Sequence, residues 1–567
     1  MTSTNLDQII RKHALKNAHD FGKASAGSVV GKVIGEVPDC KTDMKGTMQK
    51  INAIVSEINK LSKEAVEEEL KNYHFEEKKK EEKKELEVEG AEIGKVVTRF
   101  APEPSGYSHI GHAKALCLVN EITRNYQGKL VLRFDDTNPE KESQEYVEGI
   151  KEGITWLGIK WDEENYTSDH IQEIYEYAEK LISKEKAYVC TCKQETISKL
   201  REEMKPCACH GLKPKDNLLR WKDMLNGKYN EGDAILRFRG NLSALNTVMR
   251  DPMLARIIIA KHYRQAEKYR VWPGYDLAVC IMDLIEGTTH PMRSKEYELR
   301  DELYQAIFTA LDLIAPKMIG FSRLAIKGAP ISKRLLVPLV KEGKVLGWDD
   351  PRLPTLVALR RRGIIPQAIK NFVLSFGLSK VESEPTWERL LVENKKLIEP
   401  TSKHYFFVSN PVKMKIKNAK ETDVKIKLHP SADYGFREIK VNDTLYISSS
   451  DAESLKKNEI FRLKDLSNAK LITSEKELTV EQMPDAMVEK KIQWVSEESK
   501  IDCEIMVPKE LVDENKNYIP NSLEIVKGYC ESDCMNLDIG DMIQFERFGF
   551  CRLDKKEKDK LIFIFTC

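Results

Sequence analysis

The chain has 567 residues, and at the usual domain size of roughly 100–200 residues it is expected to contain about three to five domains. A hydrophobic content of 41% is enough for several packed cores and excludes a disordered chain, and the lack of any run of eighteen apolar residues excludes a membrane span. The 91 Lys and Arg residues balance 90 Asp and Glu residues, so net charge does not indicate nucleic-acid binding, and any such surface must be a local basic patch.

The first sixty residues have apolar positions at helical spacing, such as Leu6, Ile9 and Ile10, and residues 1–5 lack the features of a secretory signal. We therefore expect an N-terminal helical region in a cytoplasmic protein. Residues 27–33 resemble a phosphate-binding loop, but the glycines are one residue too close and no strand precedes them, so we interpret this segment as a loop between helices. The mixed-charge run at residues 76–85 either continues a solvated helix or acts as a linker, and it marks the first domain boundary.

The pattern changes at about residue 95. Apolar runs at residues 95–100 and 130–134 predict strands on either side of a helix at residues 113–126, which is a βαβ unit with a parallel sheet. Residues 320–400 have a mostly helical pattern. After residue 400, many short alternating strands predict one or two antiparallel β-barrels. Lysines alternate along one of these strands and either line a phosphate-binding face or form a solvated edge; they are Lys413, Lys415 and Lys417.

The strongest chemical signal lies at residues 99–112, between the first strand and the following helix. Two prolines and Gly106 build a rigid turn at the carboxyl edge of the sheet, where ligands of open α/β sheets bind. His109 and His112 then stand at the start of the helix, where the positive dipole end favours phosphate and imidazoles can donate hydrogen bonds to developing charge. An isolated His-x-x-His would more simply be two exposed capping residues.

This segment resembles the HIGH signature of class I aminoacyl-tRNA synthetases, with flanks similar to the glutamyl/glutaminyl subgroup. Residues 330–334 resemble the second signature, KMSKS, although Pro330, Ile331 and Arg334 depart from it. Residues 347–355 are similar to a segment of the archaeal and eukaryotic-type enzymes, and the resemblance covers nearly the whole chain.

The resemblance implies a multidomain α/β and β fold. Residues 1–90 form an N-terminal helical region and charged linker. Residues 91–320 form a Rossmann-like catalytic domain with a zinc-type, acceptor-binding insert at about 188–262. The ISKR loop and helical connecting domain occupy residues 321–400, and β-barrels that bind the anticodon occupy residues 401–567. Lys333 would place its ammonium against the ATP phosphates. The implied catalytic residues are His109, His112 and Lys333, and the implied ATP-binding residues are Pro102, Glu103, Gly106, His109, Gly111, His112, Ser332, Lys333 and Arg334.

The amino-acid pocket separates the two enzymes of the subgroup. By similarity, Arg99, Asp135, Tyr275 and Arg293 are the side-chain pocket residues, and glutaminyl enzymes have a small uncharged residue at the position of Arg293. A buried arginine binds a carboxylate in a bidentate way, so two arginines favour glutamate over glutamine. The alternative for Arg293 is an ordinary surface arginine.

Four cysteines lie close together in the proposed insert, as Cys190, Cys192, Cys207 and Cys209, with His210 next to them. Four such ligands suit tetrahedral Zn²⁺ in a structural role, although the Cys-x-Cys spacing is tighter than usual. The alternative is a set of free thiols that has lost its metal. The other cysteines are expected to be reduced as well.

The expected function is ligation of L-glutamate to tRNA(Glu) with Mg²⁺ and ATP, through a glutamyl-adenylate. Three alternatives stay open: ligation of glutamine by the same fold, additional charging of tRNA(Gln), and a non-catalytic tRNA-binding scaffold. The N-terminal region is also a candidate docking site for a protein partner.

Overall fold

The computed structural model describes residues 3–73, 86–473 and 477–567, and it divides into two compact units, at residues 1–85 and 86–567. The mixed-charge run at residues 76–85 lies outside the described residues. No helix in the described ranges is long and apolar enough to cross a membrane.

The N-terminal unit is a small helical bundle. Its core contains the buried side chains of Ile10, Val29, Val33 and Ile51. Val29 and Val33 are four residues apart, so they lie on the same face of their helix. Its helices are α1 (Ser3–Phe21), α2 (Ala26–Glu36), the 3₁₀ helix η1 (Pro38–Asp43), α3 (Met44–Ile58) and α4 (Lys63–Leu70).

One expectation for this unit is wrong: residues 27–33 are part of α2 and not a loop. Ser25 stands at the N-cap position, and Val29 and Val33 both face the core, so burial of this apolar stripe outweighs the low helix propensity of Gly27 and Gly31.

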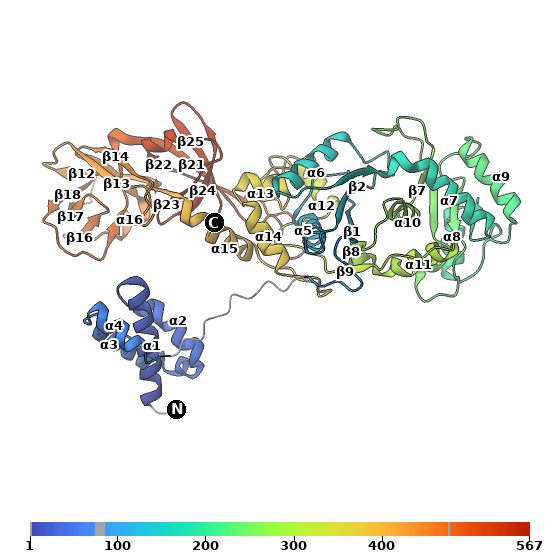
Figure 1. Ribbon diagram of the computed structural model, residues 1–567. Helices are drawn as coiled ribbons and strands as arrows, with labels where there is room; N and C mark the ends of the chain where they lie inside the picture. Colours follow the sequence, from blue (N-terminus) through green and yellow to red (C-terminus); the bar gives the residue numbers. More distant parts are fainter. Residues whose placement is uncertain (1–2, 74–85, 474–476) are drawn as a thin grey trace. The chain divides into compact units, whose positions relative to one another are not determined.

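The second unit begins with a three-stranded parallel sheet in the order β1-β2-β3 (Figure 1). The expected βαβ unit is present, with α5 connecting β1 to β2, and its strand and helix side chains form one buried core. The bounds are β1 (Val97–Phe100), α5 (Ile110–Asn125), β2 (Lys129–Phe134), α6 (Gln144–Trp156) and β3 (Glu163–Tyr166).

A second, antiparallel sheet follows, in the order β4-β5-β6-β7, and it has its own core. The chain then returns through α10 and α11 to a parallel pair, β8 and β9. The bounds are η2 (Thr167–His170), α7 (Ile171–Ser183), β4 (Ala187–Cys190), α8 (Gln194–Glu202), α9 (Pro214–Leu225), β5 (Ile235–Phe238), η3 (Thr247–Met249), β6 (Met253–Ile257), β7 (Val271–Pro273), α10 (Tyr275–Ile285), β8 (Met292–Ser294), η4 (Lys295–Arg300), α11 (Asp301–Ala310) and β9 (Ile319–Phe321).

Of residues 320–400, expected to be mostly helical, the first two belong to strand β9, and helices joined by loops follow from residue 333. The elements are α12 (Lys333–Lys341), α13 (Leu356–Arg362), α14 (Pro366–Leu374), α15 (Trp387–Ile398) and η5 (Glu399–Thr401).

The short helix α13 is attached to other parts of the unit at both ends. Before its first turn, the Pro354 carbonyl accepts a hydrogen bond from Ile110 N (2.9 Å), and Leu356 N donates to the Ser108 carbonyl (2.8 Å). At its last turn, Arg361 binds the Asp554 carboxylate with two hydrogen bonds of 3.0 and 2.8 Å, and the Arg362 carbonyl accepts one from Thr566 Oγ1 (2.7 Å). The helix therefore connects the first turn of α5 to the last strands of the chain.

The C-terminal region contains two seven-stranded sheets, in the orders β10-β23-β24-β25-β21-β22-β11 and β19-β16-β17-β18-β12-β15-β20, plus the hairpin β13-β14. The sheets are mostly antiparallel, but β12/β18, β21/β25, β10/β23 and β16/β19 pair in parallel, which the sequence pattern did not predict. The bounds are β10 (Lys403–Tyr405), β11 (Phe407–Ser409), β12 (Pro411–Lys417), β13 (Thr422–Lys427), β14 (Phe436–Val441), β15 (Thr444–Ser448), α16 (Ser449–Ser454), β16 (Ile460–Leu463), β17 (Ser467–Thr473), β18 (Leu478–Met483), β19 (Lys491–Ile492), β20 (Val495–Ser496), η6 (Glu497–Ser499), β21 (Lys500–Pro508), β22 (Leu523–Glu531), η7 (Ser532–Asn536), β23 (Met542–Phe545), β24 (Gly549–Lys556) and β25 (Lys560–Phe565).

Candidate active site

A cavity of about 760 Å³ lies at the carboxyl ends of β1 and β2, the edge where the sequence placed the ligand site. The turn after β1, the first turns of α5, α10 and α12, and strand β8 all contribute side chains to it. It brings together all but one of the residues expected to bind ATP or the amino acid: Arg99, Pro102, Glu103, Gly106, His109, Gly111, His112, Asp135, Tyr275, Arg293, Ser332 and Lys333. Arg334, the exception, is exposed and does not line the cavity.

The two histidines form a stacked pair at the start of α5, with ring centroids 3.9 Å apart. His109 is the N-cap residue, and its Nδ1 accepts a hydrogen bond from Gly111 N (3.1 Å). The Nδ1 of His112 accepts one from His109 N (3.2 Å). Because both Nδ1 atoms are acceptors, each neutral ring carries its proton on Nε2.

Both imidazoles are neutral at pH 7. Burial lowers the pKa of His112 to about 4, with a further contribution from the Lys333 charge. Burial, followed by the neighbouring His112 ring, holds the pKa of His109 well below its usual value. The pair therefore offers Nε2–H donors without adding positive charge, which suits stabilisation of charge that develops during a reaction.

Lys333 is the first residue of α12 and reaches the turn after β1. Its Nζ donates to Ser105 Oγ and lies 3.8 Å from Glu103 Oε2. A Cβ at Gly106 would lie only 3.2 Å from Lys333 Cε, so the absence of a side chain there lets the lysine cross the turn. Burial lowers the pKa of Lys333.

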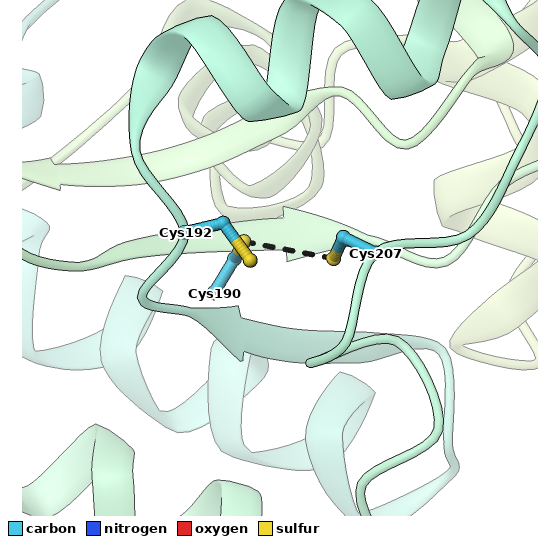
Figure 2. Close-up of side chains that lie close together, drawn as sticks. All are labelled: Cys190, Cys192 and Cys207. Carbon is cyan, nitrogen blue, oxygen red and sulfur yellow. Dashed lines mark hydrogen bonds between the residues drawn. The ribbon is translucent and has the colours of Figure 1, made fainter.

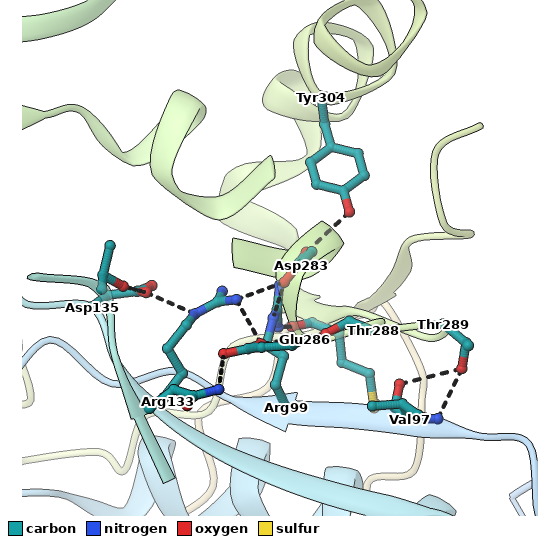
Figure 3. A network of polar contacts seen from close by, with 12 residues as sticks. Val97, Arg99, Arg133, Asp135, Asp283, Glu286, Thr288, Thr289 and Tyr304 are labelled. Carbon is teal, nitrogen blue, oxygen red and sulfur yellow. Dashed lines mark hydrogen bonds and ion pairs between the residues drawn. The ribbon is translucent and has the colours of Figure 1, made fainter. Parts of the chain in front are cut away.

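Arg99 and Arg133 lie in a buried ion network below the cavity (Figure 3). Asp283 accepts from Arg99 Nε (3.0 Å), Arg133 Nη1 (2.9 Å) and the Tyr304 hydroxyl (3.0 Å). The Nη1 of Arg99 donates to the Met292 carbonyl (2.7 Å). Protein groups therefore already occupy several of the donors of Arg99, and Asp283 balances its charge.

Arg293 is also buried, but fewer of its nitrogens make hydrogen bonds with the protein than those of Arg99. Its side chain is 6% exposed, so it is not the surface arginine of the alternative interpretation. Its Nη2 lies 2.5 Å from Asp301 Oδ1, yet neither Nε nor Nη2 makes a hydrogen bond of acceptable geometry within the described residues. These two nitrogens form the edge of a guanidinium that binds a carboxylate in a bidentate way. Arg293 is therefore more available to a carboxylate than Arg99.

Asp135 offers the opposite charge at the end of β2. Its Oδ1 accepts hydrogen bonds from Arg133 Nε (2.9 Å) and Thr167 Oγ1 (3.1 Å). The described residues provide no hydrogen bond to Oδ2, so this oxygen can accept one from a ligand in the cavity.

Several polar residues of the cavity were missed by the sequence analysis, among them Arg256, Tyr297 and Arg323. Arg323 could have been found, since it lies two residues after the end of β9, and charged residues near strand ends are candidates in α/β sheets. Arg256 lies inside β6 of the antiparallel sheet, where the sequence carries no such signal.

The four cysteines gather at the end of β4, and Figure 2 shows three of them, Cys190, Cys192 and Cys207. The Sγ atoms of Cys190, Cys192 and Cys207 all lie within 4.8 Å of one another, and Cys209 Sγ lies 3.9 Å from Cys192 Sγ. His210, the alternative ligand, is placed differently, with Nε2 3.6 Å from the Asp251 carboxylate.

Two arginines face these sulfurs. Arg237 Nη1 lies 3.7 Å from Cys207 Sγ, and Arg220 Nη1 lies 3.4 Å from Cys209 Sγ. A tetrathiolate zinc site carries a net charge of −2, which two guanidinium groups offset. The donor set and its surroundings therefore fit a structural zinc ion.

Comparisons with known proteins identify the family of the chain. A family model described as "tRNA synthetases class I (E and Q), catalytic domain" matches residues 95–400, and two "anti-codon binding domain" models of that group match residues 402–484 and 491–554. The "Glutamate--tRNA ligase" of Nitrosopumilus maritimus is 45% identical over 97% of this chain and 98% of its own length. That of Pyrococcus furiosus is 40% identical over 99% of each chain. Among solved structures, a glutamate tRNA ligase from Elizabethkingia meningosepticum is 19% identical over 54% of this chain and 70% of its own, with a TM-score of 0.40. On the family models and the full-length archaeal relatives, this chain belongs to the class I aminoacyl-tRNA synthetases of the glutamate and glutamine group.

Proposed function

We propose that this chain ligates L-glutamate to tRNA(Glu) with Mg²⁺ and ATP, through a glutamyl-adenylate. The observation that carries the choice of glutamate is the buried Arg293, whose Nε and Nη2 have no aligned acceptor and face a cavity that also contains His109, His112 and Lys333. Glutamine has no side-chain carboxylate to accept from these two nitrogens, and leaving buried donors without an acceptor costs on the order of 1–3 kcal/mol. The archaeal relatives named "Glutamate--tRNA ligase" support the same choice.

In the first step, the glutamate α-carboxylate attacks the α-phosphate of ATP and pyrophosphate leaves. Lys333 holds the departing phosphates, and the Nε2–H groups of His109 and His112 stabilise the charge that develops on the α-phosphate. The turn residues Pro102, Glu103, Gly106 and Gly111, with Ser332, shape the nucleotide site. The terminal ribose hydroxyl of tRNA then attacks the mixed anhydride. No protein nucleophile is needed, since positioning and charge stabilisation suffice.

Within the amino-acid site, Arg293 binds the side-chain carboxylate and Tyr275 packs beside it. The free Oδ2 of Asp135 accepts a hydrogen bond from the substrate ammonium. Arg99 acts chiefly through Asp283, since its donors are occupied by the protein. Residues 91–320, together with Ser332 and Lys333 of the ISKR loop, carry out this catalysis, and residues 401–567 bind the anticodon. None of the twelve cysteines, which all lie in the described ranges, forms a disulfide, which supports a reducing, cytoplasmic location.

The function is tested by aminoacylation of separated tRNA(Glu) and tRNA(Gln), with radiolabelled glutamate and glutamine in parallel. We expect glutamate to be ligated to tRNA(Glu) and glutamine to be rejected by a factor of about 10³ or more, because an amide cannot accept hydrogen bonds from both buried donors of Arg293 as a carboxylate does. The assay with tRNA(Gln) shows whether that tRNA is a second substrate. Ligation of glutamine alone would overturn the choice of amino acid, and ligation of neither would favour the scaffold alternative.

We also propose that Cys190, Cys192, Cys207 and Cys209 hold a structural zinc ion. Zinc supplies a fixed tetrahedral crosslink between the end of β4 and the segment that carries Cys207 and Cys209, and it takes no part in the reaction.

Purified protein is expected to contain about one zinc per chain by atomic emission, and Cys192→Ser is expected to lose it and to unfold at a lower temperature. Cys567→Ser, at a partly exposed thiol outside the cluster, is the matched control and should keep the metal. Equal metal content in both variants would contradict the site.

A further inference from the structure

A second, smaller cavity of about 350 Å³ lies against the main one. The two share Arg256 and Asn138, and the second is otherwise lined by Glu140, Lys141, Glu231, Ile257 and Ile258. It opens between the loop that follows β2 and strand β6 of the antiparallel sheet. It therefore adjoins the proposed site of reaction but is not lined by the turn that carries the histidines.

Arg256 has no protein partner at this junction. It is half-buried, and among the described residues no hydrogen bond or ion pair involves its guanidinium. Burial lowers the pKa of Arg256, while Glu142, Glu140 and Glu103 favour its charged form from nearby. A partly desolvated guanidinium with five donors and no acceptor is suited to an anion, and its planar fork matches phosphate.

Asn138 gives a second, independent indication of a ligand. Its backbone N–H donates to both oxygens of Glu142 (3.0 Å each), which fixes the residue. Its side-chain Oδ1 is buried and accepts no hydrogen bond from the described residues. An unsatisfied buried acceptor beside an unsatisfied cation fits a ligand that carries both a phosphate and a hydroxyl or amino donor, as a nucleotide does.

We propose that Arg256 binds the phosphate of the 3′-terminal nucleotide of tRNA, with the second cavity as the entry path of that nucleotide. This inference rests on the proposed function. The proposed function assigns the phosphates of ATP to Lys333, His109 and His112, whereas among the described residues Arg256 is the one cation that lines both cavities. A phosphate held at Arg256 leaves the attached ribose directed into the main cavity, where its hydroxyl must reach the acyl group. The carboxylates around Arg256 repel a phosphate at other positions in the cavity. The arginine therefore also fixes where the tRNA phosphate binds.

The proposal is tested by equilibrium binding of three forms of the same tRNA: complete, lacking the terminal adenosine nucleotide, and lacking it but ending in a 3′-phosphate. For the unmodified protein we expect the complete tRNA to bind about tenfold more tightly than the truncated one, with the 3′-phosphate form in between. In Arg256→Gln the three affinities should become equal within about twofold. Arg256→Lys, which keeps the charge but not the fork, should restore part of the difference. In Arg256→Gln, the slope of the logarithm of the binding constant for complete tRNA against the logarithm of salt concentration should become smaller by about one.

Arg264→Gln is the control, because Arg264 lies in the segment after β6 and pairs with Asp169 (2.6 Å) outside both cavities, although it is more exposed than Arg256. It should keep the full difference between complete and truncated tRNA. If Arg256→Gln also keeps that difference, the proposal is overturned. If instead Arg256→Gln only raises the KM for ATP, Arg256 binds a phosphate of ATP and not one of tRNA, and the proposal is again overturned. Failure of the unmodified protein to charge tRNA would refute the proposed function instead, whatever the binding results.

Discussion

Replacing Lys333 with methionine is expected to lower the rate of glutamate ligation at least about a hundredfold, the usual effect of removing one group that stabilises a charged transition state. The ammonium crosses the turn at Gly106 and is held only by Ser105 and, at 3.8 Å, by Glu103, so arriving phosphates can replace both partners. Because charge on the leaving pyrophosphate develops in the transition state, kcat should fall much more than the affinity for ATP.

The measurement is single-turnover aminoacylation with tRNA present, at varied ATP. Lys341→Met provides the control, since Lys341 is a lysine at the other end of α12 that does not line the cavity. Its rate should be unchanged. A decrease of less than about fivefold for Lys333→Met would show that this lysine is only a surface group of the loop.

Replacing Arg293 with cysteine is expected to lower kcat/KM for glutamate by about 10³ or more, because the substrate carboxylate would then be buried without its cation. The affinity for ATP should change little, since Arg293 lies in the amino-acid part of the cavity. The unmodified protein and the variant are compared by aminoacylation with glutamate and with glutamine. Discrimination against glutamine should fall sharply in the variant.

Arg293→Lys separates charge from geometry. A lysine keeps the positive charge but cannot bind a carboxylate through two parallel donors, so only part of the activity should return. If Arg293→Cys retained glutamate ligation within about tenfold, the side-chain site would have to be built on Arg99, and the Asp283 network would need to open to release its donors.

The sequence predicted the turn and the helix start of the site well, because the conformation of each is determined by a short segment of the chain. The turn at Pro102 and Gly106 and the helix beginning at His109 depend on neighbouring residues, and both are present. The pairing of Arg99 with Asp283 could not be predicted, since the two residues are separated by 184 positions and meet only through the fold. For the same reason the position of Arg256 could not be predicted, since nothing in the sequence of its strand indicates that this side chain lines two cavities.

Elsewhere, a local pattern was outweighed by packing. The glycines at 27 and 31 were interpreted as a loop, whereas Val29 and Val33 draw the segment into α2 and bury its apolar face. In the C-terminal sheets, the alternation identified strands but not their partners. The parallel pairs β12/β18 and β21/β25 depend on register between distant segments, which alternation alone does not specify.

The attachment of α13 has a consequence for dissecting the molecule. A chain cut at residue 400, where the composition changes, would lose Asp554 and Thr566 and would uncover the end of this helix. Gly363, which ends the helix with a φ of 90°, packs so closely that a Cβ there would lie 2.7 Å from Met542 Sδ, and Arg362 is only 4% exposed. The other end of the same helix is bonded to the backbone at Ser108 and Ile110. In an isolated catalytic fragment, α13 would lose the contacts of its last turn, although its first turn lies beside the histidines. Chimaeras that exchange the C-terminal region should therefore exchange α13 with it.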